Sequence, residues 1–185
     1  DIQKHELSKI YKICPAEKIE VIPLGFDLER FYTKKDEKRK QFRDKWKISK
    51  DEIVIGIIGR LVSVKNHHFF IDVIERTINN CDKKLRFFII GDGEEKQNII
   101  KYVKSKDINF STNNSPSTIQ FTSWIKDIDI ANAGMDIICL CSKNEGTPVS
   151  LIEAQASGKP IVSTRTGGIE NIVIENKTAL LSENG

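Results

Sequence analysis

The chain has 185 residues, of which 39% are apolar and 30% are charged. These values exclude a disordered chain, and the length suits one globular domain with a short extra segment. The 29 basic and 26 acidic side chains leave a net charge of only +3 and are interleaved, which argues against a nucleic-acid partner.

The beginning of the chain differs in pattern from the rest. Residues 1–20 show no regular alternation of apolar runs, and Pro15 and Pro23 lie close to the junction. We interpret this segment as a linker joined to the tail of an upstream structure, with one domain over residues 21–185. The chain opens on Asp1 and not on Met, so we expect it to be a fragment of a longer protein.

Residues 34–47, KKDEKRKQFRDKWK, form the one concentration of basic side chains in the sequence. Acidic residues interrupt the run, so we interpret it as the solvated face of a helix. A patch that binds a membrane or a polyanion is the alternative.

From residue 53 onward, short apolar runs alternate with amphipathic stretches. Strands are predicted over residues 53–59, 85–91, 119–122, 136–142 and 160–164. Helices are predicted over residues 66–80, 94–104 and 148–157, with another before residue 136 and one more starting near Gly168. Asn66 is the expected N-cap of the first of these helices, and Gly158 is expected at the end of the third. Continuous apolar strands between helices predict an α/β fold, a doubly wound Rossmann-like parallel sheet that binds ligands at the carboxyl ends of its strands.

The four cysteines do not form a recognisable framework. Cys139 and Cys141 are two residues apart in an apolar run, which places them on the same face of a strand. Zinc sites need four converging ligands, usually in C-x-x-C or H-x-x-x-H spacing, and neither spacing occurs. No apolar segment reaches the ~18 residues needed to span a bilayer, and no signal peptide begins the chain. We expect reduced thiols and a cytosolic protein.

The loop after the strand at residues 136–142 carries the strongest candidate site. Glu145 and Gly146 lie in this loop, Thr147 is the expected N-cap of the next helix, and Pro148 suits its first position. We expect three free amides in the first helical turn, those of Val149, Ser150 and Leu151. These amides carry the positive end of the helix dipole and would bind an anion. An ordinary turn between a strand and a helix is the alternative.

Glu153 follows Glu145 by eight residues and lies inside the predicted helix. Its position is ~7–8 Å along the helix axis from Pro148. One carboxylate near a reacting sugar and a second that accepts ribose hydroxyls would bracket a nucleoside diphosphate. The alternative is that Glu153 solvates the helix, since acidic residues are common in early turns.

A second candidate site lies in GRLVSVKN, residues 59–66, directly after the first predicted strand. Arg60 and Lys65 could neutralise a pyrophosphate there, Arg60 by a forked contact and Lys65 as a point charge. Two solvated loop cations are the alternative. The segment lacks the third glycine of a G-x-G-x-x-G motif, and no Walker A motif is present. His67 and His68 are assigned no role, and GDG at residues 91–93 is a plausible tight turn near a base or sugar.

In this order and spacing, the motifs resemble the carboxy-terminal, donor-binding domain of retaining glycosyltransferases of family 4, which have the two-domain GT-B fold. The resemblance runs from IEVIPLGFDLERF, which starts at Ile19, through GRLVSVKN, FFIIGDGEE, FTSW and EGTPVSLIEAQASGKPIVST to GGIENIV, which ends at Val173. It implies that residues 21–185 are the donor domain and that residues 1–20 end a missing acceptor domain.

The resemblance also implies roles for single residues. Glu145 would be the catalytic residue beside the donor sugar, and Glu153 would bond the ribose. Ile125, with Trp124 beside it, would lie by the nucleobase. The remaining donor-binding positions would contact the diphosphate: Arg60, Lys65, Gly146, Thr147, Val149, Ser150 and Leu151. Cations and the helix dipole would take the place of a metal, so no metal or other cofactor is expected.

This chain departs from the family at two points. Leu24 stands where the family commonly has Asn before Gly25, which removes a polar contact, and the acceptor domain with its catalytic histidine is missing. The resemblance therefore implies a chain that binds a UDP- or GDP-sugar but is inactive alone. The parent would be a bacterial retaining transferase of polysaccharide or glycolipid synthesis, with peripheral membrane association of the full-length protein as one expectation. Retention would come from a front-face attack or a covalent intermediate.

Two alternatives to a transferase remain. A sugar-nucleotide epimerase of the same fold would need a set of carboxylates and a histidine that the sequence does not display. A non-catalytic module that kept its nucleotide pocket is the second alternative, and the presence of Glu145, Glu153, Arg60 and Lys65 together argues against it.

Overall fold

The computed structural model describes residues 2–22 and 24–183. Within these residues, seven strands form one sheet, in the order β3-β4-β2-β1-β5-β6-β7. Every pair of neighbouring strands is parallel. The strands are β1 (Glu52–Ile58), β2 (Lys84–Ile90), β3 (Phe110–Ser111), β4 (Ile119–Phe121), β5 (Ile137–Leu140), β6 (Ile161–Thr164) and β7 (Ala179–Ser182). After β1 the chain builds one half of the sheet and then returns to build the other, so the strand order reverses between β1 and β5.

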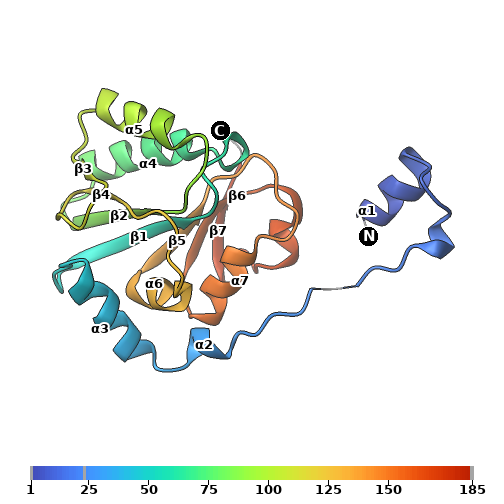
Figure 1. The fold of residues 1–185 in the computed structure, drawn as a ribbon, viewed down its shortest axis with the longest axis horizontal. Helices are drawn as coiled ribbons and strands as arrows, with labels where there is room; N and C mark the ends of the chain where they lie inside the picture. The colour runs from blue at the N-terminus through green and yellow to red at the C-terminus, as the bar shows by residue number, and fades with distance from the viewer. Residues whose placement is uncertain (1, 23, 184–185) are drawn as a thin grey trace.

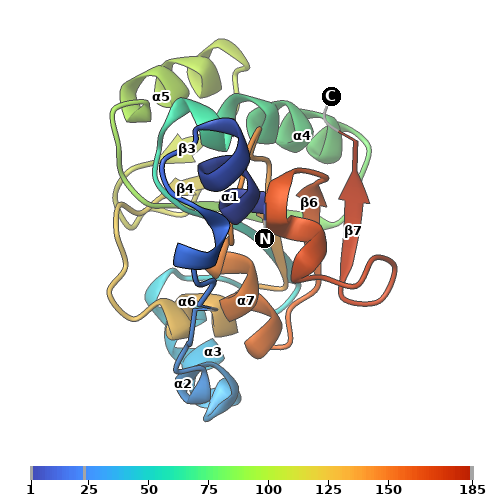
Figure 2. The same ribbon diagram turned by 90° about the vertical axis from the view of Figure 1, so that its right-hand side faces the viewer.

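Helices cover both faces of this sheet (Figure 1, Figure 2). α4 (His67–Asn79) and α5 (Lys96–Ser105) lie on one face. The other face carries α3 (Lys35–Lys45), α6 (Ile128–Gly134) and α7 (Val149–Ala156), with the single turn α2 (Glu29–Tyr32) beside them. The predicted doubly wound α/β fold is therefore confirmed.

Successive side chains of each strand point to opposite faces of the sheet, which divides the core into two apolar clusters. Phe87 and Ile89 of β2 point into the cluster under α4 and α5, whereas Phe88 and Ile90 point into the cluster under α3, α6 and α7. Both faces of a strand are buried in this way only when nearly every residue is apolar, which explains the continuous runs in the sequence. Cys139 and the nearby Cys141 belong to the same cluster, as their spacing predicted.

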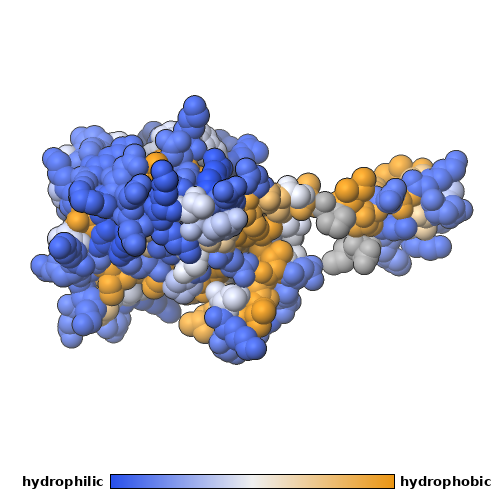
Figure 3. Space-filling view, turned by 90° about the horizontal axis from the view of Figure 1, so that it is seen from below, coloured by the Kyte–Doolittle hydropathy of each residue, from blue (hydrophilic) through white to orange (hydrophobic). Residues whose placement is uncertain are grey.

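Residues 2–22 stand clear of the sheet (Figure 1). They form α1 (Ile2–His5), a π-helical turn (Glu6–Ile10) and a 3₁₀ turn (Ala16–Lys18). Several large hydrophobic side chains of this segment are exposed, among them Ile10, Tyr11, Ile13, Val21 and Ile22. Figure 3 shows hydrophobic surface, in orange, along the segment. The division of the chain at residue 20 stays a prediction.

Several predicted element boundaries were wrong. Pro148 adopts an extended ψ of 96°, so α7 starts at Val149 and its cap is Pro148 in place of Thr147. Asn66 does precede α4, but it is left-handed (φ 52°) and makes no side-chain capping hydrogen bond. The second helix, α5, begins at Lys96, two residues later than predicted. The helix predicted near Gly168 is a short 3₁₀ helix (Gly167–Asn171).

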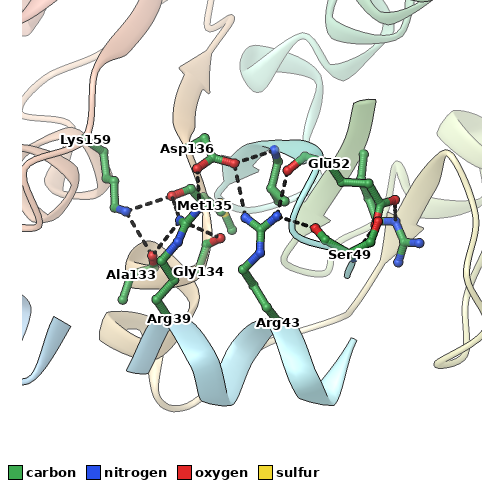
Figure 4. A network of polar contacts seen from close by, with 11 residues as sticks. Arg39, Arg43, Ser49, Glu52, Ala133, Gly134, Met135, Asp136 and Lys159 are labelled. Carbon is green, nitrogen blue, oxygen red and sulfur yellow. Dashed lines mark hydrogen bonds and ion pairs between the residues drawn. The ribbon is translucent and has the colours of Figure 1, made fainter. Parts of the chain in front are cut away.

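α3 is fastened to the sheet by a polar network around Asp136 (Figure 4). Arg39 Nη2 lies 2.7 Å and Arg43 Nη1 3.3 Å from the Asp136 carboxylate, which also accepts the Val54 amide at 2.8 Å. Burial raises the pKa of Asp136, but the Val54 amide and Arg39 outweigh it, so the pKa lies below its usual value. Residue Arg43 is only 8% exposed. The solvated helix predicted here is therefore solvated on its outer side only.

Lys159 joins the same network from the loop after α7. Its Nζ donates to the carbonyl oxygens of Ala133 at 2.9 Å and Met135 at 2.8 Å, at the carboxyl end of α6. Burial and the positive charge of the nearby Arg39 lower the pKa of Lys159 to about 8.

In the part of the chain that the structure describes, no helix combines the length and apolar character needed to cross a membrane.

Candidate functional site

The loops that follow β1 and β5 meet at the carboxyl edge of the sheet, where the strand order reverses. Lys65 ends a 3₁₀ turn (Ser63–Lys65) in the first loop, and Glu145 lies in the second. Lys65 Nζ is 2.5 Å from Glu145 Oε1, and Ser142 Oγ donates to the same oxygen at 2.5 Å. The Glu145 side chain is 9% exposed. Its carboxylate is therefore held in one position by a cation and a hydroxyl.

The backbone of the Glu145 loop is held by the last residue of β6 and by the loop that follows this strand. Thr164 Oγ1 donates to the Ser142 carbonyl at 2.8 Å, and the Gly168 amide donates to the Glu145 carbonyl at 2.9 Å. A Cβ on Gly167 would collide with the Glu145 carbonyl, and one on Gly168 would collide with that of Gly146. Gly167 also has a φ of +51°, which favours glycine.

Sequence reasoning missed this supporting role of Ser142, Thr164 and the two glycines. The available signal was the pair Gly167 and Gly168 shortly after a buried strand. Two adjacent glycines at the carboxyl edge of a sheet indicate a close approach of two backbones.

The amino end of α7 begins three residues after Gly146. The Leu151 amide donates to the Pro148 carbonyl at 3.0 Å, so it is not free, contrary to the prediction of three free amides. Among the backbone hydrogen bonds of the described residues, none uses the amide of Val149 or Ser150. Nothing lies within 4 Å of a Cβ placed on Gly146, so an anion could approach the loop here.

The side chain of Glu153 has different surroundings from that of Glu145. Its half-buried side chain borders a cavity of about 340 Å³ between α7 and the segment at residues 25–31. The lining residues are Gly25, Phe26, Asp27, Leu28, Arg30, Phe31 and Glu153. Burial raises the pKa of Glu153, Arg30 opposes the rise, and Asp129 adds to it. In the part of the chain that the structure describes, no hydrogen bond joins Glu153 to Glu145.

The remaining predicted positions lie in loops at the same edge of the sheet. Arg60 lies two residues after the end of β1 and is exposed, and within residues 2–22 and 24–183 it forms no ion pair. Trp124 follows β4 and is 59% exposed, whereas Ile125 packs against the apolar cluster under α7. Thr147 is exposed beside the amino end of α7.

No group of three or more His, Cys, Asp or Glu side chains among the described residues could hold a metal ion. The expectation that the donor binds here without a metal stays a prediction. His67, the first residue of α4, is 2% exposed, and neither of its ring nitrogens has a hydrogen-bond partner. Burial, with Lys65 nearby, lowers the pKa of His67 to about 4.

The sequence profile of the family described as "Glycosyl transferases group 1" matches residues 38–185. The chain belongs to this family. The resemblance seen in the sequence is therefore confirmed, and the sheet with its flanking helices is that of a GT-B glycosyltransferase domain.

The chain is 32% identical over 164 residues to the UDP-Gal:alpha-D-GlcNAc-diphosphoundecaprenol alpha-1,3-galactosyltransferase of Escherichia coli. The aligned region covers 86% of this chain and 40% of that protein. It spans 39–44% of the length of the first curated relatives it matches.

Two solved structures show the same fold. One is HepE of Anabaena in complex with UDP and glucose, at a TM-score of 0.79 and 23% identity, with 99% of this chain and 48% of HepE covered. The other is the C-terminal domain of a group 1 family glycosyl transferase from Francisella tularensis, at a TM-score of 0.66 and 25% identity, with 86% and 80% covered.

Proposed function

We propose that this chain is the donor-binding domain of a glycosyltransferase and holds a UDP-sugar along the carboxyl edge of its sheet. The observation that carries the proposal is the contact between Lys65 and Glu145 at the reversal point of the strand order, beside the amino end of α7. In open α/β sheets, ligands bind at this point.

The diphosphate would lie between the loop after β1 and the start of α7. Arg60 is exposed there, Lys65 reaches the same region from its 3₁₀ turn, and the amides of Val149 and Ser150 are unused by the backbone. Two cations and the positive end of a helix dipole match the charge of a diphosphate. The same groups would stabilise the diphosphate as it leaves the sugar, so this proposal includes no metal.

The two carboxylates would take different parts of the donor. Glu145, fixed by Ser142 and Lys65, would face the sugar as the catalytic residue, and the open space at Gly146 and Thr147 would admit the ligand. Glu153 would accept hydrogen bonds from the ribose hydroxyls. Its half-buried position beside the cavity at residues 25–31 supports this role, because a desolvated acceptor bonds hydroxyls more strongly.

The nucleobase would lie at the loop after β4, beside Trp124 and Ile125. Uracil is favoured because the E. coli relative is named for the donor UDP-Gal and HepE was solved with UDP.

The reaction breaks the bond between the anomeric carbon of the sugar and the diphosphate oxygen. A new bond forms from that carbon to an acceptor oxygen, UDP leaves, and the acceptor proton passes to a base or water. We propose that the configuration is retained and that the acceptor is a saccharide or a lipid-linked saccharide. The acceptor-binding domain would precede residue 21.

Isothermal titration calorimetry of this chain with UDP, GDP and NAD, each with and without magnesium, tests the proposal. We expect micromolar to millimolar binding of UDP, weaker binding of GDP, no binding of NAD, and no effect of magnesium. A folded chain that binds NAD in preference to UDP, or that binds neither diphosphate, would contradict the proposal.

A further inference from the structure

Asp92 lies in the glycine-containing loop after β2, and its carboxylate has three partners. The Gly93 amide donates to Oδ1 at 2.9 Å, and Lys96 Nζ donates to Oδ2 at 2.8 Å. Both partners are close in sequence and belong to the turn into α5. The third is Ser123, 31 residues later, whose Oγ donates to Oδ2 at 2.6 Å. These contacts, of which the one from Lys96 has the largest effect, lower the pKa of Asp92 to about 2, so its carboxylate is ionised at neutral pH.

Ser123 has an unusual backbone conformation. Its φ is 47°, in the left-handed region, which is unfavourable for a residue other than glycine. Three contacts hold it there: its hydroxyl donates to Asp92, and its carbonyl accepts the Gly91 amide at 3.1 Å and Thr122 Oγ1 at 2.9 Å. Trp124 comes next in the chain, so the conformation of Ser123 sets the direction in which the loop with Trp124 and Ile125 leaves β4.

The loops after β1, β2 and β4 continue the hydrogen-bond ladder beyond the strands. The Gly59 amide donates to the Ile90 carbonyl and the Leu61 amide to the Asp92 carbonyl, each at 3.0 Å. A Cβ on Gly91 would collide with the Gly59 carbonyl, and one on Gly93 with that of Leu61. The loop after β2 is thus packed directly on the loop that carries Arg60, and on its other side Asp92 holds Ser123.

We infer that Asp92 is a positioning residue that acts on the base end of the donor site by holding Ser123 and the Trp124 loop. This inference rests on the proposed function, in which a nucleobase lies against Trp124 and Ile125. Trp124 is a large aromatic side chain that the fold leaves 59% exposed, and stacking on a base would cover it. The contacts to Gly93 and Lys96 stay within the loop after β2 and the first turn of α5, whereas the bond to Ser123 reaches the neighbouring loop.

The test compares Ser123→Ala and Asp92→Ala with Lys96→Met in this chain. Lys96→Met removes a partner from the same Asp92 oxygen but leaves the bond to Ser123, so it is the matched control. UDP binding is measured by calorimetry, and inorganic pyrophosphate binding by its competition with UDP. We expect Ser123→Ala and Asp92→Ala to weaken UDP binding about tenfold, which corresponds to one charge-assisted hydrogen bond, with pyrophosphate binding unchanged. Lys96→Met should bind both as the wild type does.

A double variant adds a readout that general destabilisation would not produce. Trp124→Ala should itself weaken UDP binding, and adding Asp92→Ala to it should cost little more if Asp92 acts through the Trp124 loop. Urea denaturation identifies any variant that has lost its fold. If UDP binding survives in Ser123→Ala and Asp92→Ala, or if pyrophosphate binding falls as much as UDP binding, the inference is wrong and the proposed function stands. A wild-type chain that binds neither UDP nor GDP would overturn both.

Discussion

Lys65 and Glu145 are 80 residues apart in the chain, and their side chains meet with 2.5 Å between Nζ and Oε1. The two side chains are 21% and 9% exposed, so water screens the pair only in part. The cation proposed to bind phosphate and the carboxylate proposed to face the sugar therefore neutralise each other. A diphosphate that enters the site has to share Lys65 with Glu145.

Removal of either cation at the phosphate end should weaken nucleotide binding. We expect Arg60→Ala and Lys65→Ala each to reduce the free energy of UDP binding by ~1.5–3 kcal/mol, because each removes charge-assisted hydrogen bonds. Calorimetry at two salt concentrations measures the effect. Lys50→Ala is the control, since Lys50 precedes β1 and lies at the opposite edge of the sheet. Unchanged affinity in both Arg60→Ala and Lys65→Ala would refute the phosphate assignment.

The two carboxylates should respond in opposite directions to the same substitution. Glu145→Gln removes the charge that competes for Lys65, so UDP should bind more tightly, by up to ~1 kcal/mol. Glu153→Gln removes a charged acceptor from the ribose, so UDP should bind more weakly, by about 1 kcal/mol. Calorimetric titration of each variant with UDP measures both changes. The assignment of the two roles fails if Glu145→Gln weakens binding or if Glu153→Gln leaves it unchanged.

His67 should make the domain sensitive to acid. Its pKa falls from 6.5 to about 4 on folding, because burial disfavours the charged ring. Between these values the unfolded chain binds a proton that the folded chain does not, so the free energy of unfolding falls as the pH falls from 6.5 to 4. The full contribution, present above pH 6.5, is of the order of 3 kcal/mol.

Urea denaturation from pH 4.5 to 7.5 measures this slope. In His67→Leu the part of the slope due to His67 should disappear. His5→Leu is the control, because His5 is exposed and lies in α1, outside the sheet and its helices. A slope in His67→Leu equal to that of the wild type would show that another group causes the acid sensitivity.

Loss of the Asp136 charge should destabilise the fold. Asp136→Asn leaves the buried guanidinium of Arg43 without its carboxylate, although Arg43 still donates to the carbonyls of Ser49 at 2.8 Å and Glu52 at 2.6 Å. We expect the free energy of unfolding to fall by about 2–3 kcal/mol, below the full cost of a broken buried pair. Asp44→Asn, which breaks an exposed pair with Lys40, should change it by less than ~0.5 kcal/mol. Equal effects in urea denaturation would contradict this role of Asp136.

The central strands β1, β2 and β5 were predictable because burial on both faces demands an apolar run, and each of the three consists mainly of such a run. The edge strands were not. β3 has two residues, and β7 leaves Leu180 59% exposed, so neither carries that signal. The start of α7 was misplaced by one residue because Pro148 has the φ of a helix but an extended ψ, which the residue type alone does not set.

By itself, the sequence determined that Arg60, Lys65, Glu145 and Trp124 follow strands and would lie at one edge of a parallel sheet, because local apolar runs mark the strands and parallel strands end at the same edge. Only the tertiary structure decided which of these residues meet. Lys65 contacts Glu145 because β1 pairs with β5, and Asp92 contacts Ser123 because β2 pairs with β4. The order of strands depends on packing between segments far apart in the chain, and no local spacing encodes it.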